Sequence, residues 1–251
     1  MSPPRAWTPS TVWREPAVAT LYLEPVARIF ESIEPGATPS QSRFLWSAAP
    51  PVIRALGRVF FSYRIEREAP LPEPPFVIAA NHYSHFDAAV VGAAVGRPVR
   101  FLALEDLFGA NRLLDWLIIG FGSIPTPRTR HPISAVRTAL GALDAGDIVG
   151  VFPEATRVSH WGTLPPRRGA AWLAKRAGVP LVPVAVLGTG RAFGLDNRLR
   201  VSTVRVIVGQ AIAPEDGDVG QLSERWAGWV GRQVERYPRL EPSERPAVGE
   251  R

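Results

Sequence analysis

The sequence contains no cysteine among its 251 residues, which excludes disulfides, thiolate nucleophiles and metal sites with cysteine ligands. Lysine is almost as scarce, because Lys175 is the only one and arginine supplies the rest of the basic charge. No stretch approaches the roughly 18–20 consecutive apolar residues that cross a bilayer. The first residues also lack the apolar core of a signal peptide. We therefore expect a cytoplasmic protein, or one bound peripherally to the inner face of the cell membrane.

The composition is otherwise that of a folded globular protein. Hydrophobic residues make up 46% of the chain and charged residues 21%, enough for one large domain with a substantial core. The formal net charge of +6 is compatible with an anionic membrane, a nucleic acid or a phosphorylated substrate. Because no basic run is interleaved with aromatic residues, we expect no nucleic-acid partner.

Composition, together with the proline and glycine residues that interrupt regular structure, predicts three regions. Residues 1–42 form an N-terminal arm with a short helix at 18–33, and proline and glycine mark a linker at 34–42. Residues 43–237 form the domain, and residues 238–251 form a polar, flexible tail.

An amphipathic helix is predicted at residues 50–67. Its apolar face consists of Val52, Ile53, Leu56, Val59, Phe60 and Tyr63. Arg54 and Arg58 fall on the opposite face. The pattern allows two interpretations: a helix packed on the domain core, or a helix lying at a bilayer surface.

From residue 76 onward the pattern alternates between strands and helices. Strands are predicted at 76–80, 99–104, 122–126, 147–152, 179–188 and 202–209. Helices are predicted at 87–95, 105–120, 133–143, 169–177 and 220–236. This alternation predicts an α/β fold with a mostly parallel central sheet flanked by helices. Ligands of such folds bind beyond the carboxyl ends of the strands.

The first candidate site is FVIAANHYSHFDAAV, residues 76–90, where His82 and Asp87 lie between a strand and a helix. If the chain turns between them, the carboxylate can fix the imidazole tautomer and make the other nitrogen a better base. Alternatively, Asp87 caps the helix that begins at Ala88. His85 adds a third potential metal ligand, but no other segment supplies a partner motif, so no metal is expected.

Two later clusters also follow predicted strands. Arg128 and Arg130 could bind a phosphate through their guanidinium groups, or lie solvated in a loop. Glu154, Thr156 and Arg157 follow the strand at 147–152. The carboxylate and guanidinium of this cluster could pair with each other, or hold a polyol phosphate between them.

Taken in order, these blocks resemble the PlsC-like glycerophosphate/lysophosphatidate acyltransferases. The family's first block, Asn-His-x-Ser-x-x-Asp, is matched by Asn81, His82, Ser84 and Asp87. Its second, a glycine-containing strand ending in arginine, is matched by Gly122 and Arg128. Its third, Phe-Pro-Glu-Gly-Thr-Arg-Ser, aligns with residues 152–158, and its fourth, Val-Pro-Val, with 182–184. A basic residue followed by glycine before a helix also recurs, as Arg168-Gly169.

The resemblance covers residues 50–210 and implies a glycerolipid acyltransferase-like fold that moves a fatty acyl group from acyl-CoA or acyl-carrier protein to a hydroxyl. It implies that His82 is the general base, that Asp87 orients it, and that no cofactor or metal is required. The membrane lipid surface is an expected partner. The residues implied in substrate binding are Asn81, Ser84, Arg128, Glu154, Thr156, Arg157, Arg168 and Gly169.

The sequence departs from the family at four positions. Ala155 replaces the usual glycine, and its methyl group is expected to narrow the room for a close backbone turn or to forbid a positive φ there. Val158 replaces the usual serine, and Pro125 and Pro127 alter the second block. The acceptor therefore stays open: it is a glycerophosphate or lysophospholipid, or another hydroxyl or amine. A non-catalytic acyl- or lipid-binding module is a further alternative.

Overall fold

The structure is a computed structural model that describes residues 40–107, 112–126 and 133–242. The predicted helix at 18–33 and the loop arginines Arg128 and Arg130 lie outside these ranges. Within them, seven strands form a single sheet in the order β1-β7-β6-β2-β5-β3-β4. The strands are β1 (Arg64–Arg67), β2 (Phe76–Ala80), β3 (Val99–Leu104), β4 (Ile124–Thr126), β5 (Ile148–Val151), β6 (Leu181–Leu187) and β7 (Arg205–Val208).

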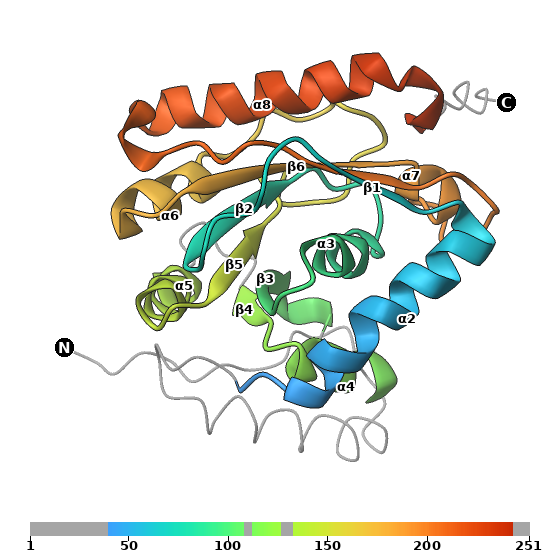
Figure 1. Cartoon of the computed structure of the whole chain (residues 1–251), viewed down its shortest axis with the longest axis horizontal. Coiled ribbons are helices and arrows are strands. Elements are labelled where there is room, and N and C mark those ends of the chain that lie inside the picture. The colour runs from blue at the N-terminus through green and yellow to red at the C-terminus, as the bar shows by residue number, and fades with distance from the viewer. Residues whose placement is uncertain (1–39, 108–111, 127–132, 243–251) are drawn as a thin grey trace, which may run out of the picture.

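All neighbouring strands pair in parallel except β6 and β7, which pair antiparallel. Helices cover both faces of this sheet (Figure 1). The longer helices are α2 (Arg43–Phe61), α3 (Asp87–Val95), α4 (Arg112–Gly120), α5 (Ile133–Asp144), α6 (Gly169–Ala177) and α8 (Val219–Arg236). The short ones are η1 (Glu105–Leu107), α7 (Thr189–Ala192), η2 (Pro214–Asp216) and η3 (Pro238–Leu240). The predicted mostly parallel α/β fold is therefore confirmed.

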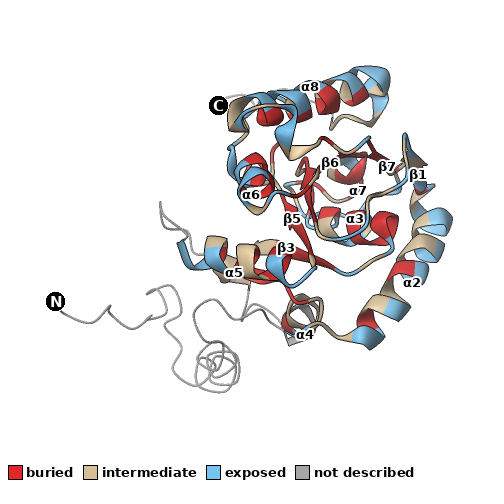
Figure 2. Cartoon of the chain, turned by 60° about the vertical axis from the view of Figure 1, so that its left-hand side comes forward, coloured by how far each residue is buried: buried red, intermediate tan, exposed pale blue. Residues whose placement is uncertain are grey.

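The side chains of β2 alternate between two hydrophobic clusters, because successive residues of a strand point to opposite faces. Val77 and Ala79 join the cluster under α5, α6 and α8. Phe76 and Ile78 join the cluster on the face covered by α3. Every residue of β2 is buried, and the residues coloured as buried follow the strands of the sheet (Figure 2). The central strand is thus fixed from both faces before it reaches the candidate site.

The predicted helix at 50–67 is wrong at both ends. The helix α2 begins at Arg43, because the Ser42 side chain accepts a hydrogen bond from the Leu45 N–H. It ends at Phe61, since Ser62 adopts a left-handed φ of 42°. Residues 64–67 form β1 instead, which pairs with β7. The sequence analysis missed this strand because its residues are mostly polar and the apolar residues before it are spaced as in a helix.

The apolar face of α2 points away from the domain. The side chains of Val52, Leu56, Val59 and Phe60 are 52–75% exposed. Arg54 instead turns inward and donates a hydrogen bond to the carbonyl of Ala93, near the end of α3. The core-packing interpretation is therefore wrong for these four apolar residues. No helix within the described ranges combines the length and apolarity needed to cross a bilayer.

The predicted boundary of the flexible tail is also wrong. Residues 238–240 form η3, and the carbonyl of Leu240 accepts a hydrogen bond from the Gly188 N–H at the end of β6. The packed domain thus continues beyond residue 237, through residues that the sequence pattern marks only as polar. Residues 243–251 lie outside the described ranges.

Candidate functional site

The candidate site lies where β2 and β5 end. Ala79 of β2 is paired with Val151 of β5, so His82 and Glu154 each follow a paired residue by three positions. Because the two strands are parallel neighbours, both side chains emerge at the same edge of the sheet. His82 and Glu154, two of the polar residues that we expected beyond the strand ends, are therefore brought together there.

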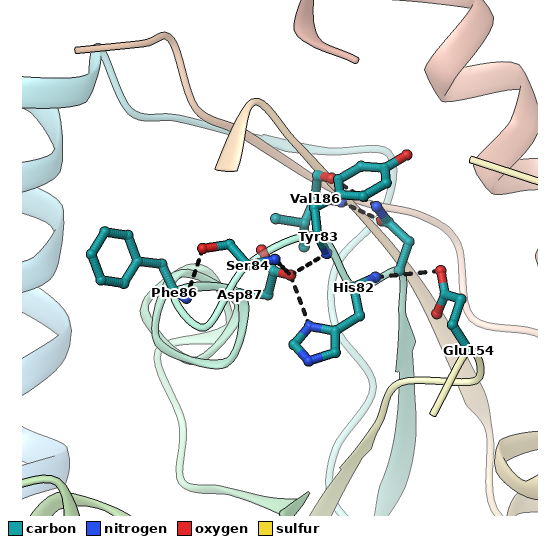
Figure 3. A network of polar contacts seen from close by, with 8 residues as sticks. His82, Tyr83, Ser84, Phe86, Asp87, Glu154 and Val186 are labelled. Atoms are coloured by element: carbon teal, nitrogen blue, oxygen red, sulfur yellow. Dashed lines mark hydrogen bonds and ion pairs between the residues drawn. The ribbon is translucent and has the colours of Figure 1, made fainter. Parts of the chain in front are cut away.

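The loop between β2 and α3 folds Asp87 back toward His82 (Figure 3). Oδ2 of Asp87 lies 2.9 Å from Nδ1 of His82, and also accepts the N–H groups of Tyr83 at 2.6 Å and Ser84 at 2.7 Å. Asp87 is completely buried. Although it begins α3, its side chain does not cap that helix: Oδ1 has no hydrogen-bond partner among the described residues, and the N–H groups bonded to Oδ2 precede the helix. The turn that would join the two side chains is present, and the helix-capping alternative is wrong.

These contacts define the tautomer of the His82 ring. Oδ2 of Asp87 already accepts two backbone N–H groups, so the third contact requires that Nδ1 of His82 carry the proton. Nε2 then holds the free lone pair of the neutral ring. The His82 side chain retains 19% exposure, so the ring is only partly covered by protein.

Asn81 and Ser84 hold the loop in place. The Asn81 side chain donates to the carbonyl of Val186 at 2.8 Å and accepts the Val186 N–H at 2.7 Å, continuing the pairing of β2 with β6. Oγ of Ser84 accepts the N–H of Phe86. Both residues are completely buried. The structure thus places both side chains in contact with backbone, whereas the resemblance implied that they bind substrate.

Two aromatic rings support the imidazole. Phe152 stacks on His82 with ring centroids 4.1 Å apart, and Phe101 stacks on Phe152 at 5.5 Å. Gly150 makes room for this arrangement, since a Cβ there would lie 2.4 Å from the Phe101 ring. Sequence reasoning missed the role of Phe152 and Phe101. The signal was a phenylalanine directly after β5, at the position that faces Ala80 at the end of β2.

Glu154 is buried beside the histidine. Its Oε1 accepts the backbone N–H of His82 at 3.3 Å, and Oε2 has no hydrogen-bond partner among the described residues. Burial raises the pKa of the Glu154 carboxyl from 4.5 to about 7, and the nearby Asp87 carboxylate adds to this effect. Glu154 therefore carries a partly protonated carboxyl near neutral pH.

The loop after Glu154 corrects one expectation. Ala155 adopts a positive φ of 58°, although we expected its methyl group to forbid this conformation. The left-handed conformation costs an alanine roughly 1–2 kcal/mol, and the loop holds it there through neighbouring hydrogen bonds. The N–H of Val158 donates to the carbonyl of His82 at 2.9 Å, and the Val158 side chain is buried in the core.

The remaining predicted residues lie nearer the surface. Thr156 is exposed, and Arg157 is half-buried with its guanidinium donating to Oδ1 of Asn197. The Arg157 charge lies close enough to His85 to contribute, after burial, to a lowered pKa of that imidazole. Glu154 and Arg157 therefore have different partners in this structure, and of the two alternatives the direct pairing of their side chains is not seen.

The pair Arg168-Gly169 is exposed at the start of α6. The Arg168 guanidinium lies 3.7 Å from the position that a Cβ on Gly220 would occupy, so it rests against the first turn of α8. The described contacts of Arg168 thus link it to α8, and none links it to His82.

Fold and site together define an α/β protein with an oriented histidine beyond the carboxyl ends of its parallel strands. The sequence matches the family described as Acyltransferase over residues 62–187, half of the chain. The chain therefore belongs to the acyltransferase family, and the resemblance to its PlsC-like members is confirmed.

Named relatives agree with this assignment. The chain is 28% identical over 167 residues to a 1-acyl-sn-glycerol-3-phosphate acyltransferase of Bacillus subtilis, covering 66% of this chain and 81% of the relative. It is 34% identical over 117 residues to the human 1-acyl-sn-glycerol-3-phosphate acyltransferase alpha, covering 46% and 41%. For a chloroplastic relative from Brassica napus the identity is 27%, with 60% and 44% covered. The chain thus spans less than half the length of the human and plant relatives.

A solved structure shares the fold. The crystal structure of the 1-acyl-sn-glycerophosphate acyltransferase PlsC from Thermotoga maritima superposes with a TM-score of 0.65 at 22% identity. The match covers 88% of this chain and 91% of that one. It confirms the arrangement of sheet and helices.

The raised pKa of Glu154 predicts a pH-dependent stability. A carboxyl that stays protonated longer in the folded state stabilises the fold below its unfolded pKa, and this contribution is lost as pH rises from 4.5 to about 7. Glu154→Gln removes the titration. Its free energy of unfolding relative to wild type should rise by about 3 kcal/mol between these limits, at 1.36 kcal/mol per pKa unit. Urea denaturation of both proteins at several pH values measures this difference in the free energy of unfolding.

The control for this prediction is Glu224→Gln, because Glu224 is exposed on α8. Its stability relative to wild type should not change with pH. The buried-carboxyl interpretation fails if Glu154→Gln gives the same flat difference across the range.

Proposed function

We propose that the protein moves a fatty acyl group from the thioester of acyl-CoA or acyl-carrier protein to a hydroxyl of a glycerophosphate or lysophospholipid. The observation that carries the proposal is the contact between His82 and Asp87 at the end of β2, in a chain of the acyltransferase family. The names of the bacterial, plant and human relatives support the choice of acceptor.

In the proposed reaction, Nε2 of His82 takes the proton of the acceptor hydroxyl while its oxygen attacks the thioester carbonyl. An ester bond forms, the carbon–sulfur bond breaks, and the proton passes to the leaving thiolate. Asp87 holds the ring through Nδ1 and stabilises the imidazolium that forms transiently. The exchange of a thioester for an ester involves no change of oxidation state, and we propose no cofactor.

The loop after β5 is the proposed acceptor-binding segment. Thr156 and Arg157 lie at or near the surface two and three residues after Glu154, where a hydroxyl and a guanidinium can bind a phosphate. Glu154 itself, with Oε2 lacking a described partner, can bond to a glycerol hydroxyl. We retain Arg128 as a second phosphate ligand on the strength of the motif alone. We reassign Asn81 and Ser84 as positioning residues, and leave out Arg168 and Gly169.

We further propose that α2 binds the membrane surface from which the acceptor comes, at the inner face of the cell membrane. Its outward apolar residues sit beside the exposed Arg58, the combination that suits an anionic bilayer. The loop between α7 and β7 adjoins the same end of α2, since the Val204 N–H donates to the carbonyl of Phe61. Leu199 and Val201 of that loop are 64% and 89% exposed.

The catalytic part of the proposal is tested by thiol release. Wild-type protein given an acyl-CoA should release CoA only when an acceptor is added, with lysophosphatidate or glycerol 3-phosphate more effective than a phosphate-free alcohol. His82→Ala should lower kcat by at least about 10²-fold, since a positioned base contributes 10²–10⁴. The matched control is His160→Ala, because the hydrogen bonds described for His160 join it to Ser159 and Thr163 of its own loop.

Three results would count against this account. Near-wild-type turnover in His82→Ala would show that His82 is not the general base. Binding of acyl-CoA without thiol release in the wild type indicates the non-catalytic module. Turnover confined to acceptors without a phosphate favours the alternative hydroxyl or amine substrates.

The membrane part is tested by vesicle sedimentation. The double variant Val59→Ser/Phe60→Ser should bind anionic vesicles more weakly than wild type, because each side chain would otherwise bury apolar surface. The control is Ile133→Ser, an equally exposed apolar residue on α5. Equal sedimentation of the double variant and wild type would contradict a role for α2 in membrane binding.

A further inference from the structure

The segment after α8 reaches back to the candidate site. Oε1 of Glu241 accepts a hydrogen bond from the Tyr83 hydroxyl at 2.9 Å and another from the backbone N–H of Trp161. Tyr83 directly follows His82 and is completely buried. Trp161 lies seven residues after Glu154, in the loop that follows β5. One carboxylate therefore joins the two loops that build the site.

The segment that carries Glu241 is seated by further contacts at the end of β6. The carbonyl of Leu240 accepts the Gly188 N–H at 3.1 Å, and the carbonyl of Arg239 accepts from the Arg191 guanidinium at 2.7 Å. A Cβ on Gly190 would lie 2.7 Å from Pro242 and 3.0 Å from Cβ of Tyr83. The missing side chain at 190 thus leaves the space in which Pro242 and Tyr83 pack.

Two direct hydrogen bonds already join the same loops. The His82 N–H donates to Glu154, and the His82 carbonyl accepts from the Val158 N–H. Both bonds fix the backbone of His82 alone. Tyr83 instead contacts the Asp87 carboxylate, because the Tyr83 backbone N–H donates to Oδ2 of Asp87. Holding the Tyr83 ring therefore also holds the backbone donor that keeps the Asp87 carboxylate in position.

We propose that Glu241 is a positioning residue for the reaction: its carboxylate, bonded to Tyr83 and Trp161, holds the loop of His82 and Asp87 against the loop of the acceptor-binding residues. We call this three-residue contact the Glu241 bridge. The inference rests on the proposed function. It assigns the C-terminal segment a role in catalysis although that segment touches no reacting atom.

The test compares three variants of the full chain. Glu241→Ala removes the bridge, so kcat should fall about tenfold, since small displacements of catalytic groups are costly. The KM for the acyl donor should change less than kcat. Glu241→Gln keeps an oxygen that accepts both hydrogen bonds and should restore most of the activity. Glu235→Ala removes an exposed carboxylate from α8 and should leave kcat unchanged.

A second measurement does not depend on activity. Hydrogen exchange of backbone amides should accelerate in Glu241→Ala within peptides that cover residues 80–88 and 156–163, and not in a peptide that covers β1. Glu241→Gln and Glu235→Ala should exchange as wild type does. If the wild-type protein releases no thiol, the proposed function fails, whereas the exchange data still decide whether the bridge holds the two loops.

Wild-type kcat per folded molecule in Glu241→Ala would overturn the inference, as would a loss in Glu241→Gln equal to that in Glu241→Ala. If Glu241→Ala does not fold, Tyr83→Phe replaces it, because this change removes one donor and leaves the packed ring. A severalfold lower kcat and faster exchange at 80–88 in Tyr83→Phe support the bridge. Wild-type values for both contradict it.

Discussion

A single carboxylate oxygen organises the site. Oδ2 of Asp87 receives the His82 ring and the backbone N–H groups of Tyr83 and Ser84. In a fully buried position these bonds replace the water that Oδ2 would otherwise bind, whereas Oδ1 has no hydrogen-bond partner among the described residues. The same bonds fold the loop between β2 and α3 into the shape that brings the two side chains together. Orientation of the His82 ring and folding of the loop therefore depend on the same hydrogen bonds.

The rest of the fold supplies a fixed support for that loop. Asn81 continues the pairing of β2 with β6 through its side chain, so the chain leaves the sheet at a defined point. Phe152 stacks on the imidazole from the neighbouring strand end. The Glu241 bridge then reaches the next residue, Tyr83, from the far end of the chain. Burial also affects the adjacent Glu154, since it raises the pKa of that carboxyl to about 7.

Much of this arrangement could be predicted from local sequence patterns. The continuous apolar run at 76–80, the Ala/Val-rich helix at 87–95 and the glycine-ended helix at 169–177 are strong local signals, and the structure has them at those residues. Strand β1 was missed because its pairing with β7 depends on residues far away in the sequence. Glu241 was missed for the same reason, since 158 residues separate it from Tyr83. The positive φ of Ala155 reflects the surrounding loop overriding the preference of one residue.

The central claim is that Asp87 fixes the proton on Nδ1 of His82 and leaves Nε2 as the base. Nitrogen NMR of protein labelled with ¹⁵N-histidine tests it most directly, with the His82 signals identified by their loss in His82→Ala. The account predicts that the neutral His82 ring carries its proton on Nδ1 in the wild type, and that Asp87→Ala abolishes this preference. A neutral ring protonated on Nε2 in the wild type would contradict it.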